Sequence, residues 1–228
     1  MLDQLPEIIS SFGKSIDDMI RLIYWITGGF FIAMEGYLVY LVVRYRQKKG
    51  VASTYEHGDT WNQIQWIIVF SVVVLFLDLT LDFMGGKTWA AVKIDLPKCD
   101  LLVKVQAKQF DWTFIYPGKD GQLGTADDIE SYREFHVPVG KKVEIIMTSK
   151  DVIHDFFLPE VRLKQDVMPQ REIKGWFDTN KAGTFHLVCD EICGIGHTRM
   201  TGVLQVDDEK TFGDWLAAKD KEEHGGAQ

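Results

Sequence analysis

Cysteine and positive charge are both scarce in this chain of 228 residues, and each scarcity excludes a class of protein. Three cysteines are too few for a scaffold built on disulfides. Lys and Arg number 25 against 33 Asp and Glu, and such a net-negative chain is a poor binder of nucleic acid, because phosphate contacts need clustered Lys and Arg. The spacing C-x-x-C-H does not occur, which argues against a covalently attached c-type haem in this chain. A net charge of −8 suits a cationic partner, because complementary charge raises encounter rates.

Two long apolar runs lie in the first third of the chain. From Leu22 to Val43 there are 22 residues with one charge, Glu35, which is long enough to cross the roughly 30 Å core of a bilayer. From Ile64 to Leu81 there are 18 residues with one charge, Asp78. The pair predicts a transmembrane hairpin, with a buried soluble helix as the alternative for the shorter run. A cleaved signal peptide is disfavoured, because the first run is too long and acidic residues precede it.

The charges around these runs predict an orientation. Four basic residues directly follow the first run: Arg44, Arg46, Lys48 and Lys49. Because cytoplasmic loops collect such residues, we expect the hairpin loop in the cytoplasm. The N-terminus and the C-terminal region then lie on the outer, periplasmic side of the inner (plasma) membrane. Glu35 and Asp78 are costly at membrane depth and should face a protein partner rather than lipid.

Beyond residue 92 the pattern changes to short β-like segments separated by Gly, Pro and Asp. Such strands, with no helical pattern between them, predict an antiparallel sandwich or barrel. The predicted strands are Leu101–Ala107, Phe110–Tyr116, Tyr132–Val137, Val143–Thr148, Ile153–Leu158, Ile173–Phe177, Thr184–Cys189 and Val203–Val206. The predicted organisation is an outer segment 1–18, a hairpin 19–84 with spans at about 20–45 and 62–84 and a loop 46–61, a linker 85–99, a β domain 100–207 and a tail 208–228 in which 211–219 could be helical.

The segment from Cys189 to Met200 carries the chemistry. It contains two thiols, an imidazole and a thioether within twelve residues, and His154 lies on an earlier strand. Soft sulfur combined with imidazole selects copper. The second cysteine, Cys193, follows four residues after the first, so both sulfurs can bridge two metal ions. Zinc and a Cys189–Cys193 disulfide remain alternatives.

The spacing C-x-E-x-C-x3-H-x2-M resembles subunit II of cytochrome c oxidase. The flanking segments Asp151–His154 (DVIH) and Leu163–Pro169 (LKQDVMP) also resemble that family. The resemblance covers nearly the whole chain and implies an N-terminal two-helix transmembrane hairpin followed by an all-β, cupredoxin-like Greek-key domain. It also implies a dinuclear copper centre that receives electrons from a c-type cytochrome. Those electrons would pass to haem in subunit I, where oxygen is reduced and protons are translocated.

The resemblance assigns a role to each matching residue. Cys189 and Cys193 would bridge the two coppers, and the other ligands would be His154, Met200, His197 and the carbonyl of Glu191. The Glu191 side chain would reach a magnesium ion at the boundary with subunit I. Two rivals are a copper-free quinol oxidase subunit II and a membrane-tethered copper carrier.

The chain departs from the family where electrons enter. The family has Q-W-x-W, and here Phe110 takes the place of the first Trp while Trp112 matches the second. Gln63 replaces a glutamate that serves as a proton-pathway mouth in many members. Asp151 and Asp166 are candidates for docking a basic cytochrome.

Three further features have ordinary explanations. The acidic segment Lys119–Asp128 is interpreted as a hairpin turn, with a calcium loop as the alternative. His136 and His186, on predicted strands, are interpreted as structural or exposed.

Overall fold

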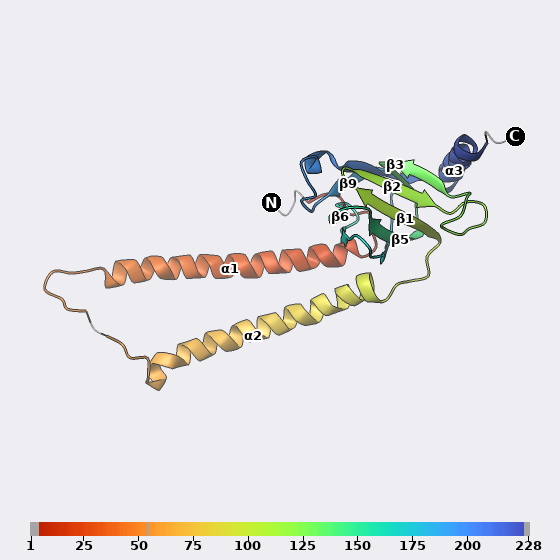
Figure 1. Ribbon diagram of the computed structural model, residues 1–228. Coiled ribbons are helices and arrows are strands. Elements are labelled where there is room, and N and C mark those ends of the chain that lie inside the picture. The colour runs from red at the N-terminus through yellow and green to blue at the C-terminus, as the bar shows by residue number, and fades with distance from the viewer. Residues whose placement is uncertain (1–4, 54, 226–228) are drawn as a thin grey trace. The chain divides into compact units, whose positions relative to one another are not determined.

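The computed structural model describes residues 5–53 and 55–225, which divide into two compact units. One unit comprises residues 17–88, and the other joins the residues up to Ile16 to those from Trp89 onward. The outermost residues of the predicted segments 1–18 and 208–228, and residue 54 in the predicted loop, lie outside the described residues. Figure 1 shows long helices in the first unit and a β structure in the second.

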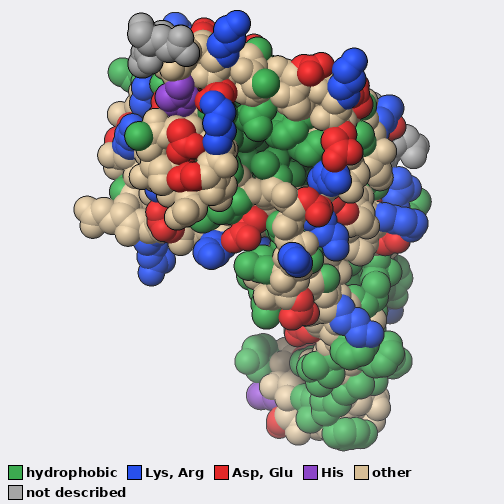
Figure 2. Space-filling model, turned by 90° about the vertical axis from the view of Figure 1, so that its right-hand side faces the viewer, with side chains coloured by type: hydrophobic (Ala, Val, Ile, Leu, Met, Phe, Trp, Pro, Cys, Tyr) green, Lys and Arg blue, Asp and Glu red, His purple; other side chains and the backbone are tan. Residues whose placement is uncertain are grey.

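The helical unit contains α1 (Gly13–Tyr45) and α2 (Trp61–Trp89), which are long and apolar enough to cross a membrane. None of the residues in the apolar window of either helix is buried within the chain. Large side chains such as Trp66 and Phe76 are 64% and 70% exposed, and hydrophobic side chains crowd the helical part of Figure 2. So much exposed apolar surface is unfavourable in water and is what a bilayer requires. The two apolar N-terminal helices are confirmed, and the chain is membrane-anchored.

The predicted linker 85–99 is wrong over most of its length. Helix α2 continues to Trp89 and passes directly into a π-helix, η2 (Ala90–Ile94). Gly85 and Gly86 each cost a helix only about 1 kcal/mol, and Pro97 is the first residue that stops it. The extended stretch before the first strand therefore spans only residues 95–100.

The β unit is a sandwich of two five-stranded sheets, with strand orders β3-β2-β1-β5-β8 and β4-β10-β9-β6-β7. The strands are β1 (Leu101–Lys108), β2 (Asp111–Tyr116), β3 (Ile129–Tyr132), β4 (Glu134–Pro138), β5 (Lys142–Ser149), β6 (His154–Leu158), β7 (Leu163–Val167), β8 (Ile173–Asp178), β9 (Gly183–Cys189) and β10 (Thr201–Asp207). A third helix, α3 (Glu209–His224), follows β10. The cupredoxin-like fold class is confirmed.

Three details differ from the sequence-based prediction. The pairs β1–β5 and β4–β10 are parallel, because each joins strands that are distant in the sequence rather than the two arms of a hairpin. The predicted strand 132–137 is two strands in different sheets, and the chain switches sheets at Arg133, whose φ is +62°. Strand β7 was not predicted, because its exposed Lys164 and Asp166 make an edge strand look like a loop.

Aromatic rings from both sheets form the core. Phe114 of β2 stacks on Phe135 of β4 with centroids 4.5 Å apart, and Phe156 of β6 packs its edge against both. Full burial of such a side chain contributes about 1.5–3 kcal/mol. This core holds the two sheets in a fixed register, and the candidate ligands are attached to strand ends at one end of it.

The N-terminal residues belong with the β unit rather than forming a separate segment. Ile9 is fully buried in the core. Its N–H donates to the carbonyl of Glu160 (3.0 Å), and its own carbonyl accepts from the N–H of Asn180 (2.8 Å). Buried Ile9 and Phe12 therefore fix the described part of the predicted segment 1–18 to the sandwich, and the β unit includes this segment up to Ile16.

Candidate metal centre

Two antiparallel strands and one loop bring the candidate ligands together. Cys189 is the last residue of β9 and His154 the first of β6, and the register pairs Phe156 with Cys189. The loop then reverses at Gly194, whose φ of +136° suits glycine. A short 3₁₀ turn (His197–Arg199) leads to Met200 at the start of β10, where the Cys189 N–H donates to the Met200 carbonyl.

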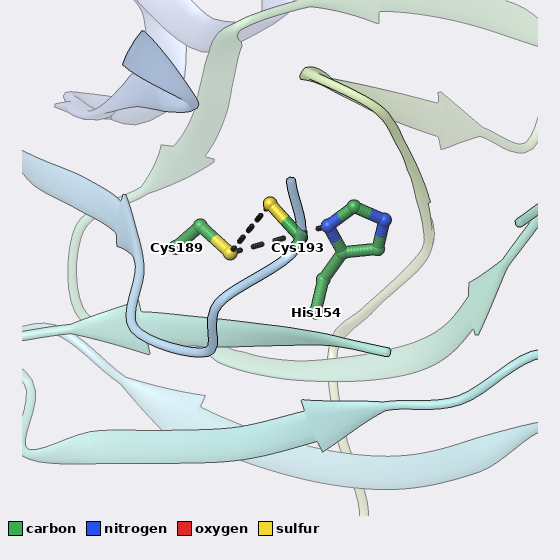
Figure 3. Close-up of side chains that lie close together, drawn as sticks. All are labelled: His154, Cys189 and Cys193. Carbon is green, nitrogen blue, oxygen red and sulfur yellow. Dashed lines mark hydrogen bonds between the residues drawn. The ribbon is translucent and has the colours of Figure 1, made fainter. Parts of the chain in front are cut away.

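The two sulfurs and the imidazole converge on a small volume, as Figure 3 shows. Cys189 Sγ lies 3.8 Å from Cys193 Sγ and 4.0 Å from His154 Nδ1. Cys193 Sγ lies 3.5 Å from His197 Nδ1 and 3.7 Å from Met200 Sδ. The carbonyl oxygen of Glu191 is 3.3 Å from Cys189 Sγ. All six predicted ligand residues therefore contribute an atom within 4.0 Å of one of the two sulfurs.

This donor set fits copper. Ligand atoms about 2.0–2.3 Å from a shared ion lie roughly 3–4 Å from one another, which is the range of separations seen here. Two thiols with imidazole and thioether donors form a soft set. The cysteines are free thiols, with sulfurs well beyond the about 2.0 Å of a disulfide bond. Both sulfurs occupy the centre of this donor set.

Asp151 orients the His154 ring, a function the sequence did not suggest. Its Oδ1 accepts from His154 Nε2 at 2.8 Å, which leaves Nδ1 directed at Cys189. Metal-binding histidines usually have their second nitrogen fixed in this way. Burial opposes ionisation of Asp151, but the Gln109 N–H and His154 lower its pKa. The sequence feature that could have indicated this contact is the three-residue spacing between Asp151 and His154, which places the carboxylate beside the ring.

The two thiols differ in acidity. Burial disfavours the Cys189 thiolate, yet His154 and the backbone N–H groups nearby lower its pKa to about 6. Burial and the neighbouring Cys189 thiolate raise the pKa of Cys193 to about 11. The pKa values of the two thiols are therefore shifted in opposite directions, and Cys189 loses its proton more readily than Cys193.

The two aromatic candidates for accepting electrons lie in different environments. Trp112 is fully buried, with its ring centroid 6.2 Å from that of His154, so a docked protein cannot touch it. Phe110 is half-buried beside the ligand loop. Their electron-accepting roles remain predictions.

The remaining candidates lie outside this cluster. The Glu191 side chain is exposed, and so is Asp166, which pairs across strands with Asp155. His136 bonds Asp207 (2.7 Å) and stacks on Trp215 of α3, while His186 bonds Glu160 (2.6 Å). Both histidines have structural partners, as the sequence analysis expected.

The segment Lys119–Asp128 forms the loop between β2 and β3. Asp120 Oδ1 accepts from the Gln122 N–H, Asp127 Oδ2 from the Asp120 N–H and Asp128 Oδ2 from the Gly124 N–H. These bonds from the backbone stabilise an acidic turn.

Comparisons with known proteins point to one family. A family model described as the periplasmic domain of cytochrome c oxidase subunit II matches residues 101–206. The alternative cytochrome c oxidase subunit 2 of Bradyrhizobium diazoefficiens is 30% identical, over 88% of this chain and 79% of that protein. Cytochrome c oxidase subunit 2 of a Synechocystis species is 27% identical, over 94% and 75%. The crystal structure of the periplasmic domain of subunit II of cytochrome oxidase of Bradyrhizobium japonicum has 32% identity and a TM-score of 0.50, over 55% of this chain and 97% of that chain.

Proposed function

Because the chain belongs to the cytochrome c oxidase subunit II family, we propose that it is the subunit of a haem–copper terminal oxidase that receives electrons on a dinuclear copper centre. The donor would be a c-type cytochrome, and the acceptor would be haem in subunit I. Oxygen reduction and proton translocation belong to that partner subunit. The observation that carries the proposal is the convergence of two free thiols with two imidazoles, a thioether and a carbonyl.

The residues of this chain would supply a rigid set of ligands. Copper, when bound, supplies a one-electron redox couple. Cys189 and Cys193 would hold the copper through their sulfurs, and Asp151 fixes the ring of His154. Trp112 fills the space beneath His154 and excludes water from that side. Ligands held by strand ends and packed rings move little when charge changes, which favours fast electron transfer.

The exposed Glu191 side chain supports a second part of the proposal. Its backbone carbonyl faces Cys189, while its carboxylate points away into solvent. In the complete oxidase this carboxylate would bind magnesium at the boundary with subunit I. The hairpin loop would lie in the cytoplasm, with the β unit on the periplasmic side, as the basic residues after α1 indicate.

The copper-free quinol oxidase relative is disfavoured, because it would leave six converging donors without a function. A membrane-tethered copper carrier would bind metal without forming a complex with a haem-bearing subunit. The test is to purify the chain from its native membrane, identify the subunits that accompany it and follow haem reduction after addition of reduced cytochrome c. We expect fast haem reduction that is lost in Cys193→Ser, while the variant remains in the membrane. A chain that purifies without a haem-bearing subunit would support the carrier instead.

A further inference from the structure

The turn between β1 and β2 contacts both segments that carry the candidate ligands. It consists of Gln109 and Phe110, and the register closes it by pairing Lys108 with Asp111. Gln109 lies 84 residues before Cys193 in the sequence, so the contact is a product of the fold. The ligand arrangement therefore depends on a turn that supplies no ligand itself.

Gln109 is hydrogen-bonded toward both ligand segments. Its side-chain Nε2 donates to the carbonyl oxygen of Cys193 at 2.5 Å. Its backbone N–H donates to Asp151 Oδ2 at 2.6 Å, and the other oxygen of Asp151 accepts from His154. Gln109 thus links the loop that carries Cys193 to Asp151, which fixes the His154 ring.

Phe110 packs against the loop at its two glycines. A Cβ added to Gly196 would lie 2.4 Å from Cδ2 of the Phe110 ring, and one added to Gly194 would lie 3.0 Å from Cζ. Gly196 has an ordinary φ of −89°, which any residue adopts. The backbone at Gly196 therefore does not need glycine, and the Phe110 ring is what excludes a side chain there.

Backbone hydrogen bonds hold the two ends of the loop. The Cys189 N–H donates to Met200 O (3.1 Å) and the Asp190 N–H to Asp155 O (3.3 Å) at the start of the loop. The His197 N–H donates to Gly194 O (3.1 Å) near its end. The Cys193 carbonyl lies between these points, so Gln109 restrains the part of the loop that carries the second sulfur.

We propose that Gln109 and Phe110 are positioning residues that hold the Cys189–Met200 loop in its metal-binding conformation before any metal arrives. The proposal rests on the proposed copper function for its purpose, but the contacts of Gln109 and Phe110 with the loop are a property of the metal-free chain. A loop already ordered loses little conformational freedom on binding, which raises metal affinity. Removing the contacts of Gln109 or Phe110 should increase the mobility of the loop and speed the loss of copper.

The first test is Gln109→Met in the full-length chain. Methionine keeps the length of the side chain and removes the amide donor, while the backbone bond to Asp151 remains. We expect faster amide hydrogen exchange across residues 190–200 of the metal-free protein. We also expect release of copper to a chelator to be about tenfold faster, the size typical of residues that support metal ligands. Gln122→Met is the matched control, because Gln122 is exposed in the loop between β2 and β3. Exchange and release at wild-type rates in Gln109→Met would overturn the role of Gln109.

The second test is a double-mutant cycle between Gly196→Ala and Phe110→Ala. Gly196→Ala should speed loop exchange and copper release strongly when Phe110 is present, because the new methyl group displaces the ring or the loop. In the Phe110→Ala background the same substitution should have a much smaller effect. Equal effects in both backgrounds would overturn the packing role of Phe110. If the wild-type chain bound no copper, the proposed function would fail. Hydrogen exchange of the metal-free loop would still show whether Gln109 and Phe110 order it.

Discussion

Asp151→Ala separates two roles for one carboxylate. The sequence predicts that Asp151 helps to dock a basic cytochrome, whereas its Oδ1 lies 2.8 Å from His154 Nε2 in the structure. The substitution removes the acceptor that fixes the ring and leaves the N–H of a fully buried imidazole without that partner. Loss of such a support typically lowers metal affinity about 10–100-fold. That range corresponds to about 1.4–2.8 kcal/mol of binding free energy.

The assay is competition for copper between the purified full-length chain and a chelator of known affinity. Asp166→Ala is the control, because it removes an equal charge from an exposed residue that pairs with Asp155 rather than with a candidate ligand. We expect a clear loss of copper affinity in Asp151→Ala and none in Asp166→Ala. If Asp151→Ala bound copper as tightly as the wild type and only raised the KM for cytochrome c, the ring-orienting role would be refuted and the docking role supported.

Three further predictions follow from other parts of the β unit. Met200→Leu nearly conserves the volume of this buried side chain and should shift the reduction potential more than it lowers copper content. A potentiometric titration that shows no shift would remove Met200 from the ligand set. Trp215→Ala removes the ring of α3 that stacks on His136 with centroids 4.0 Å apart. The free energy of unfolding, measured by chemical denaturation, should fall by about 2 kcal/mol. Asp214→Ala, at an exposed neighbour, is the neutral control. The Thr211 backbone N–H and hydroxyl lower the pKa of the Asp208 carboxyl, which caps the start of α3. This cap therefore stabilises the helix fully at pH values above the ordinary pKa of an aspartate. The stabilisation is lost as the pH falls through the lowered pKa. NMR signals of residues 209–212 should show acid fraying in the wild type and fraying already at neutral pH in Asp208→Ala.

Most of the candidate ligands could be identified from the sequence because they lie close together in it. Cys189, Cys193, His197 and Met200 follow one another at short spacing, and soft donors at that spacing indicate copper whatever surrounds them. The support that Gln109 gives to the Cys193 segment was not predictable from spacing. Gln109 reaches Cys193 across 84 residues, and only the folded sandwich reveals that contact.

The fold shows the same division between local and distant information. Apolar runs and alternating strands have their own periodicity, so the two helices and most strands could be predicted. The polar edge strand β7 and the sheet switch at Arg133 could not, because pairing with distant strands determines both. Ile9 gave no signal either, because the segment around it (LPEIISSF, residues 5–12) is too short for its apolar residues to show a helical or strand period.

The most direct test of the central claim is the ratio of copper to protein in the chain purified with its oxidase, measured together with its electronic spectrum. Two coppers per chain that share one unpaired electron between them are expected, because two sulfurs 3.8 Å apart stand at the centre of six donors. One copper per chain with the spectrum of a mononuclear site, or zinc in its place, would contradict the account.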